Sequence, residues 1–196
     1  EESAEDYAAA TVPMMSGEEV IGILHVHISK QVKIDDKEQN LLHEVAQDLA
    51  FARDKLLADQ DLRDRDAKLE AIIASAPYVM VLVDSDRRVR QINSAGAEFA
   101  GRSTEELLGL HAGEALRCIH ALDDPRGCGF GHGCEECPVR NTVLETLSSR
   151  KGYEDVEVDM TFERSDGQED RTFLFHTKPL EVNEQQMCLV VFDDIT

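Results

Sequence analysis

The first apolar residues of the chain fall in two short runs, and the second run alternates between two sets of side chains. Thr11–Met15 and Val20–Ser29 flank Ser16–Glu19, a stretch that contains a glycine. Alternation of this kind is typical of strands, and a glycine between two such runs is typical of a turn. We therefore predict a β-hairpin. Two strands alone are marginally stable in water, so the hairpin needs a helix or a partner chain to cover it.

From Asp36 to Ser75 the chain contains neither proline nor glycine, and Asp35 with Glu38 forms a capping box. This pattern predicts one long helix. Its apolar residues keep heptad spacing in two stretches, separated by a highly charged segment that has too few apolar residues for a buried helix. The two stretches are Leu42, Val45, Leu49, Ala52 and Leu56, and then Leu62, Leu69, Ile72 and Ile73. We predict that this helix joins two copies of the chain in a parallel homodimer.

After Ala76-Pro77 the pattern changes to short strands and helices, which predict an α+β domain. The sheet should be antiparallel and five-stranded, with helices covering one face. The predicted strands are Tyr78–Val83, Arg88–Ile92, Glu154–Glu163, Asp170–Glu181 and Gln186–Asp193. The predicted helices are Ser94–Ala100 with Asn93 as its N-cap, Thr104–Leu108 with a Ser103/Glu106 capping box, His111–Leu116 and Val139–Ser149.

Charge narrows the choice of partners. The 196 residues include 40 acidic and 20 basic ones, for a formal net charge of −20. Such a charge repels phosphate backbones and anionic lipid heads, so we expect neither nucleic-acid binding nor direct membrane contact. No apolar run approaches the roughly 20 residues that span a bilayer, and residues 1–6 lack the features of a signal peptide. We expect a cytoplasmic protein.

The segment from Cys118 to Cys137 carries the candidate chemistry. It holds four of the five cysteines, with nine, five and two residues between them, and four glycines at alternate positions from Gly127 to Gly133. A loop so rich in glycine loses much entropy on ordering and has few apolar side chains to offset the loss. A metal centre bound by Cys118, Cys128, Cys134 and Cys137 would hold it. Clustered cysteines in a reducing compartment are more often ligands or redox groups than disulfides.

The identity of that centre stays open between two main alternatives. Cys-x-x-Cys pairs serve zinc sites and iron–sulfur clusters alike. The proline that follows Cys137 and the alternating glycines favour an iron–sulfur cluster. Structural zinc, and free thiols or disulfides, are the alternatives. His120 and His132 lie in the same loop and are alternative ligands, although solvated loop histidines are commoner. Cys188 lies between Met187 and Leu189 in the last strand and is expected to be a small buried hydrophobe.

The amino-terminal part resembles the end of a GAF domain, which closes with two strands and a helix. The resemblance covers residues 10–57 and rests on Val12–Met15, Ile21–Val26 and Leu41–Ala46. It implies that residues 1–57 are the C-terminal portion of a GAF-like domain. The earlier strands and helices of that fold are absent, so its ligand pocket is absent too. The long helix, residues 36–75, then serves as a signalling coiled coil.

Residues 70–196 resemble a PAS domain. The resemblance rests on Val83-Asp84, Ile92–Ala95, Gly101–Gly109 and the terminal Asp193–Thr196. It implies a five-stranded sheet around a small cavity that senses a ligand, cofactor or redox state. It also implies that the closing Asp-Ile-Thr passes a signal to an output domain, often a histidine kinase of a two-component system. Residues 118–137 depart from the family as a cysteine-rich insertion.

The sequence lacks the residues with which PAS domains bind two other cofactors, haem and flavin. Haem-binding members use a histidine on the helix that covers the sheet, and Pro138–Glu145 contains none. Flavin photosensors begin that helix with Asn-Cys-Arg-Phe, where this chain has Glu-Cys-Pro-Val. We therefore expect a non-enzymatic sensory segment whose iron–sulfur cluster, of the four-iron type, responds to redox state or oxygen. The alternative is a small-ligand or interaction module with a structural zinc in the four-cysteine loop.

Overall fold

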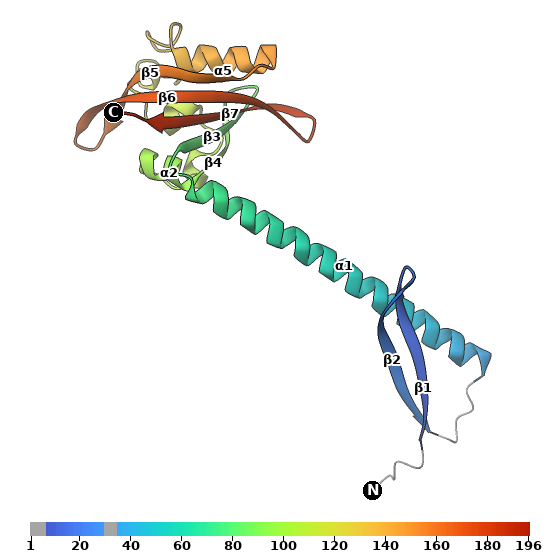
Figure 1. Cartoon of the computed structure of the whole chain (residues 1–196). Helices are drawn as coiled ribbons and strands as arrows, with labels where there is room; N and C mark the ends of the chain where they lie inside the picture. Colours follow the sequence, from blue (N-terminus) through green and yellow to red (C-terminus); the bar gives the residue numbers. More distant parts are fainter. Residues whose placement is uncertain (1–6, 30–34) are drawn as a thin grey trace. The chain divides into compact units, whose positions relative to one another are not determined.

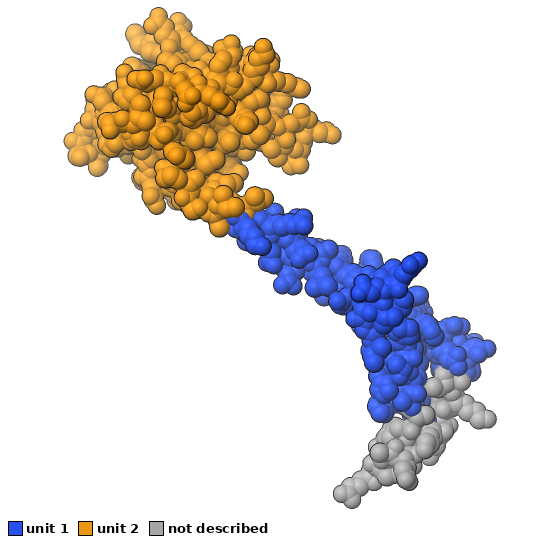
Figure 2. Space-filling view, in the orientation of Figure 1, with its two compact units in different colours: residues 1–68 blue, residues 69–196 orange. Residues whose placement is uncertain are grey.

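A computed structural model describes residues 7–29 and 35–196 of the chain (Figure 1). The chain divides into two compact units, residues 1–68 and residues 69–196 (Figure 2). Residues 1–6 and 30–34 of the expected GAF-like portion lie outside the described residues. Each unit is described by itself below.

The first unit contains the predicted hairpin. Strand β1 (Tyr7–Ser16) pairs antiparallel with β2 (Glu19–Ser29). The turn between them uses Gly17 in the left-handed region, with φ of 58°, a conformation that glycine adopts without steric cost. Strand β1 begins earlier than the sequence pattern indicates, because the ladder continues until Tyr7 faces Ser29.

Helix α1 (Asp36–Ser75) has the predicted limits. Its first turn is closed by the capping box, in which the Asp35 amide donates to Glu38 and the Lys37 amide donates to Asp35. Only Ala46 and Ala50 are buried among its residues, so the covered face of the helix is the one with small side chains. Of the heptad leucines, Leu42 is half-buried, whereas Leu49 and Leu56 are 44% and 69% exposed.

The second unit is built on a five-stranded antiparallel sheet, which confirms the α+β fold predicted from the sequence. Its order is β4-β3-β7-β6-β5, so the last strand of the chain lies at the centre (Figure 1). The strands are β3 (Val79–Asp84), β4 (Val89–Ile92), β5 (Tyr153–Arg164), β6 (Gly167–Val182) and β7 (Gln185–Asp194). Strands β5 and β6 extend beyond the predicted limits because their pairing continues to a two-residue loop, where Arg164 faces Gly167.

Short helices connect β4 to the cysteine segment, and one longer helix follows it. They are α2 (Ser94–Ala100), α3 (Thr104–Leu107), α4 (Ala112–Ala115), the 3-10 helix η2 (Ile119–Ala121) and α5 (Pro138–Ser149). The predicted N-cap Asn93 and the Ser103/Glu106 capping box are confirmed. His111 and Leu116, predicted inside a helix, are the two caps of α4 instead.

The core of this unit lies between the sheet and its helices. Phe162, Phe173 and Phe175 are fully buried on the sheet, and Val143 of α5 belongs to the same cluster. A buried polar contact crosses the helix–sheet interface. The buried hydroxyls of Thr146 on α5 and Thr177 on β6 are hydrogen-bonded at 2.7 Å. Each satisfies the other's polar atom, so their burial costs little. Helix α5 is thereby tied to the sheet by packing and by a hydrogen bond.

Candidate functional site

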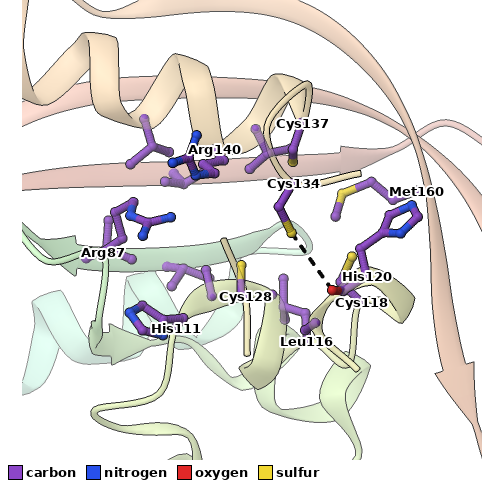
Figure 3. Close-up of a pocket in the computed structure, with 18 of the residues that line it drawn as sticks. Arg87, His111, Leu116, Cys118, His120, Cys128, Cys134, Cys137, Arg140 and Met160 are labelled. Atoms are coloured by element: carbon purple, nitrogen blue, oxygen red, sulfur yellow. Dashed lines mark hydrogen bonds between the residues drawn. The ribbon is translucent and has the colours of Figure 1, made fainter. Parts of the chain in front are cut away.

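The four cysteines of the glycine-rich segment surround the same cavity, which has a volume of about 70 Å³ (Figure 3). Cys118 is the N-cap of η2 and Cys137 is the N-cap of α5. Cys128 and Cys134 belong to the loop between these helices. The structure thus brings the four predicted site residues together around one space, although they lie up to 19 positions apart in the sequence.

The rest of the cavity wall comes from the sheet and from the helices around it. Apart from the cysteines it is almost entirely apolar. The apolar residues include Val81 and Val83 of β3, Leu116 after α4, Val139 and Val143 of α5, and Met160, Val190 and Phe192 of the other strands. A group bound here would therefore be in contact with the core of the domain and with three strands of its sheet.

Glu114 on α4 holds the start of the loop. Its carboxylate accepts hydrogen bonds from the backbone N–H of Cys128, at 3.1 Å, and from that of His111, at 3.3 Å. The neighbouring Gly113 lies against Cys128, since a Cβ at position 113 would come within 2.6 Å of the Cys128 sulfur. The backbone of Cys118 is also fixed, because it forms a β-bridge with Phe162 of β5. Two of the four cysteines are thus positioned by hydrogen-bonded backbone.

The four alternating positions require glycine for two different reasons. Gly127 and Gly129 adopt positive φ, of 86° and 103°, which disfavours any other residue. Gly131 and Gly133 do not, but both pack directly against His120. A Cβ at Gly131 would collide with the His120 carbonyl oxygen, and a Cβ at Gly133 would lie 3.0 Å from the His120 ring. The loop therefore depends on glycine for its backbone conformation and for its close packing.

The sulfur atoms have specific hydrogen-bond partners. The backbone N–H of Gly129 donates to the Cys134 sulfur at 3.3 Å, and the Cys134 thiol donates to the His120 carbonyl at 3.8 Å. Burial raises the pKa of Cys118, with smaller contributions from the neighbouring Cys137 and Cys134. Burial also raises the pKa of Cys128 to about 11, and here Cys134 and Cys118 add to the effect. Without a metal, these two thiols are protonated at neutral pH.

Two charged side chains line the cavity although the sequence gave no indication of them. Arg87 extends from the turn between β3 and β4, and Arg140 extends from the first turn of α5 (Figure 3). The positive charge of Arg87 partly opposes the rise in the pKa of Cys128. Neither arginine carries a sequence signal for this role. Arg87 is 31 residues before Cys118 and belongs to another hairpin, so only the fold places it here.

The other predicted ligands separate into two groups. His120 lines the cavity, and its Nδ1 is paired with an Asp123 carboxylate oxygen at 3.0 Å. His132 does not line it and is exposed on the outer side of the loop. Cys188 lies in β7, is fully buried in the core and does not line the cavity either. Its predicted role as a small buried hydrophobe is confirmed.

The side chains as they stand are not arranged around one ion. Within the described part of the chain, no group of three or more His, Cys, Asp or Glu residues has the geometry to hold a metal. All five cysteines are free thiols. That the four cysteines bind a metal stays a prediction. In the same described ranges, no helix has the length and hydropathy needed to cross a membrane.

The second unit resembles known domains in sequence and in fold. Residues 67–134 match the family model described as PAS domain. The PAS domain of HTR-like protein from Haloarcula marismortui is 18% identical, with a TM-score of 0.47 over 70% of this chain and 98% of that chain. The PAS domain of nitrogen regulation protein NR(II) from Vibrio parahaemolyticus is also 18% identical, with a TM-score of 0.48 over 64% of this chain and 96% of that chain.

A third similar structure covers more of the chain. It is the Escherichia coli DhaR(N)–DhaL complex, at 14% identity and a TM-score of 0.51, over 95% of this chain and 55% of that chain. A search of curated proteins gave no match. At 14% identity, this third structure bears on the fold alone.

Proposed function

We propose that this chain is a sensory segment of a signal-transduction protein, because residues 67–134 match the PAS domain family model. The proposed sensor is an iron–sulfur cluster of the four-iron type, bound by Cys118, Cys128, Cys134 and Cys137. When bound, such a cluster supplies a reversible one-electron change and sensitivity to oxygen. The segment itself is regulatory and has no catalytic role in this proposal.

One observation carries the proposal, namely that all four cysteines of the segment line the same cavity. Four thiols converge there from a loop that has few other means of holding its shape. Cys134 is 4% exposed, and the remaining three are partly buried, so the loop presents sulfur inward instead of to solvent. Thiolates are the usual ligands of iron–sulfur clusters. The donor set therefore suits the group.

The cavity has room for more than a single zinc ion. One water molecule needs about 10–15 Å³ by the same measure, so a cavity of about 70 Å³ has room for several atoms. Four sulfurs around a zinc ion each lie about 2.3 Å from it and enclose no further space. In a cluster each thiolate binds a different iron, so the four ligands lie further apart. Structural zinc remains the rival, since four thiolates suit it as well.

Two features of the loop stabilise the thiolate form of its cysteines. The hydrogen bond from the Gly129 amide to Cys134 strengthens when the sulfur becomes a thiolate, because charged acceptors form stronger hydrogen bonds. Cys137, at the N-cap of α5, lies beside the positive end of that helix. Both features lower the cost of placing thiolates in an apolar cavity. Loading the site then releases the protons of Cys118 and Cys128.

A route for the signal runs from the site into the sheet. Helix α5 begins at Pro138, directly after Cys137, and packs on the sheet through Val143 and the Thr146–Thr177 hydrogen bond. A change in the loop would therefore move the helix that covers β6 and β7. Strand β7 ends at Asp194, which is paired with Arg171 of β6. We propose that this end of the sheet transmits the signal to an output domain such as a histidine kinase.

The first unit supports a dimeric arrangement. Residues 1–57 fit the C-terminal portion of a GAF-like domain, since two paired strands and a helix occur in the expected order. The hairpin leaves Val45, Leu49 and Leu56 of the α1 stripe exposed, and exposed apolar residues at heptad spacing suit a second copy of the same helix. We propose a parallel homodimer through α1. The net charge of −20 makes nucleic acid an unsuitable partner, and free thiols suit the reducing cytoplasm.

Metal analysis after anaerobic purification tests the proposal. We expect a brown protein that absorbs near about 400 nm and contains about four iron and four sulfide per chain. Exposure to air should bleach it. A colourless protein with one zinc per chain and no sulfide would replace the sensory cluster with the structural zinc site. Parallel preparations in medium supplied with iron or with zinc exclude an effect of metal availability, because the site should select iron–sulfur in both.

A further inference from the structure

Arg87 and Arg140 enter the four-cysteine cavity from different elements of the fold. Arg87 belongs to the turn that joins β3 and β4, whereas Arg140 belongs to α5 (Figure 3). The two side chains bring two positive charges to a wall that is otherwise almost entirely apolar. Burying charge in such surroundings is unfavourable unless an opposite charge is present.

The hydrogen bonding of Arg140 is incomplete. Its Nη1 donates to the side-chain oxygen of Asn141 at 3.1 Å. Its Nε is buried and has no hydrogen-bond partner within the described part of the chain. A buried donor without an acceptor is costly, and an acceptor bound in the cavity would remove that cost.

The side chain of Arg87 is half-buried and approaches the cysteine loop, where its positive charge acts on Cys128. Its two terminal nitrogens lie 3.1 Å from the position that a Cβ on Gly129 would occupy, so the group rests directly on the cysteine loop. The residue adopts a positive φ of 62°, which is unfavourable for arginine. A strained backbone that directs a charged group at a site is a feature of functional positions.

A metal centre with four thiolate ligands would give both arginines a negatively charged hydrogen-bond acceptor. Four thiolates and a core with two positive charges leave two net negative charges, and the same sum holds for a zinc ion. We propose that Arg87 and Arg140 form a cationic pair that donates hydrogen bonds to sulfur atoms of the four-cysteine centre and compensates its charge. This inference rests on the proposed function for the presence of the centre. It adds that these two residues set how readily the centre accepts an electron.

The direction of the effect follows from the charges. One-electron reduction, with the electron supplied by an external reductant such as dithionite, adds a third negative charge to the centre. A nearby positive charge stabilises the reduced form more than the oxidised form. Removing it should make reduction harder. The same charge should also strengthen the binding of zinc, because zinc is bound by thiolates and releases protons on binding.

The test replaces each arginine with glutamine, which keeps hydrogen-bond donors but removes the charge. Arg87→Gln and Arg140→Gln are compared with Arg126→Gln, which removes one positive charge from the same loop. Arg126 does not line the cavity, and its guanidinium is paired with Asp124 at 2.9 Å. Iron and sulfide content is measured first, and the midpoint potential is then found by an anaerobic spectroscopic titration.

We expect wild-type iron and sulfide content in all three variants. At the wild-type midpoint, the ratio of reduced to oxidised centre should fall about tenfold in Arg87→Gln and in Arg140→Gln, a shift of about 59 mV to more negative potential. It should stay unchanged in Arg126→Gln. Wild-type potentials in both cavity variants, or an equal shift in all three, would overturn the inference. If Arg140→Gln does not fold, Arg140→Lys keeps the charge and should shift the potential less than Arg87→Gln does.

The outcome also separates the two proposals. If the wild-type protein binds zinc in place of a cluster, the sensory function fails but the cationic pair is still tested. Zinc affinity, measured by competition with a chelator, should then fall about tenfold in Arg87→Gln and Arg140→Gln and stay constant in Arg126→Gln. Unchanged affinity in the cavity variants would overturn the inference. A wild-type protein that binds neither metal overturns both.

Discussion

The backbone N–H of Gly129 donates a hydrogen bond to the sulfur of Cys134, across 3.3 Å. This contact ties the middle of the cysteine loop to the most buried of its four thiols. Hydrogen bonds from backbone amides to sulfur orient metal ligands and adjust the properties of the metal they hold. The backbone of the loop is therefore fixed in part by this sulfur atom, and its glycines can be tested one at a time.

Gly131→Ala should destabilise the domain by about 1–3 kcal/mol, the usual cost of overpacking. The added Cβ would collide with the backbone oxygen of His120, which cannot turn away. Gly133→Ala is the matched control, because its Cβ would meet only the His120 ring, at 3.0 Å, and that ring is half exposed and can rotate. Urea unfolding of the metal-free proteins measures both. Equal losses of stability in the two variants would contradict this account of the loop.

Replacing Cys134 and Cys137 together with serine should abolish iron binding and leave a folded domain. The core cluster includes the sheet and Val143 of α5 but depends little on the loop, so the thermal midpoint should fall by only a few degrees. Hydrogen exchange should quicken in the loop and in the first turn of α5, while β6 and β7 stay protected.

The control for this change is Cys188→Ala, which removes a cysteine that does not line the cavity. It should keep full metal content, although it loses some stability from the core. If the double serine variant unfolds completely, the metal is a structural staple and the zinc alternative gains support.

Dimerisation through α1 should be lost in Leu49→Asp combined with Leu56→Asp. Both leucines lie on the exposed heptad stripe, and two acidic residues facing each other across a coiled-coil seam repel and cannot be buried. Sedimentation should show a dimer for the wild type at micromolar concentration and a monomer for the variant. Gln47→Asp with Gln60→Asp adds the same charge to exposed positions off the stripe and should stay dimeric. A monomeric wild type would exclude the dimer.

Cys188 should make the stability of the metal-free protein depend on pH. Burial raises its pKa from 9.0 to about 11. The folded state therefore holds this proton more tightly than the unfolded state, so the stabilisation is complete below pH 9 and is lost as the pH rises towards 11. Such a shift amounts to about 2 kcal/mol at pH 11.

Urea unfolding at pH 8 and pH 11 measures this contribution. The free energy of unfolding should fall by about 2 kcal/mol more in the wild type than in Cys188→Ala, which lacks the titrating thiol. The other groups that titrate in this range are common to both proteins and cancel in the comparison. Parallel losses in the two proteins would show that the thiol ionises freely in the folded state.

Local sequence rules were sufficient for the elements of the fold. The limits of α1 follow from the Asp35/Glu38 box and from a stretch without proline or glycine, and Asn93 caps α2 as expected. These features act within a few residues of chain, so they can be identified without knowing the fold. The alternation in β5, β6 and β7 likewise indicated strands, while their ends were missed by one to three residues because pairing with a neighbour decides where a strand stops.

The sequence by itself also identified Cys118, Cys128, Cys134 and Cys137 as a group, because thiols at short spacing in a glycine-rich loop have few other uses. Only the tertiary structure decided what surrounds them. It separated His120 from His132, placed Cys188 in the core, and brought Arg87 and Arg140 to the same cavity. It also showed that the buried residues of α1 are Ala46 and Ala50, whereas Leu49 and Leu56 are exposed. These outcomes depend on contacts between distant parts of the chain, and the packing of whole elements, not the character of any single segment, determines them.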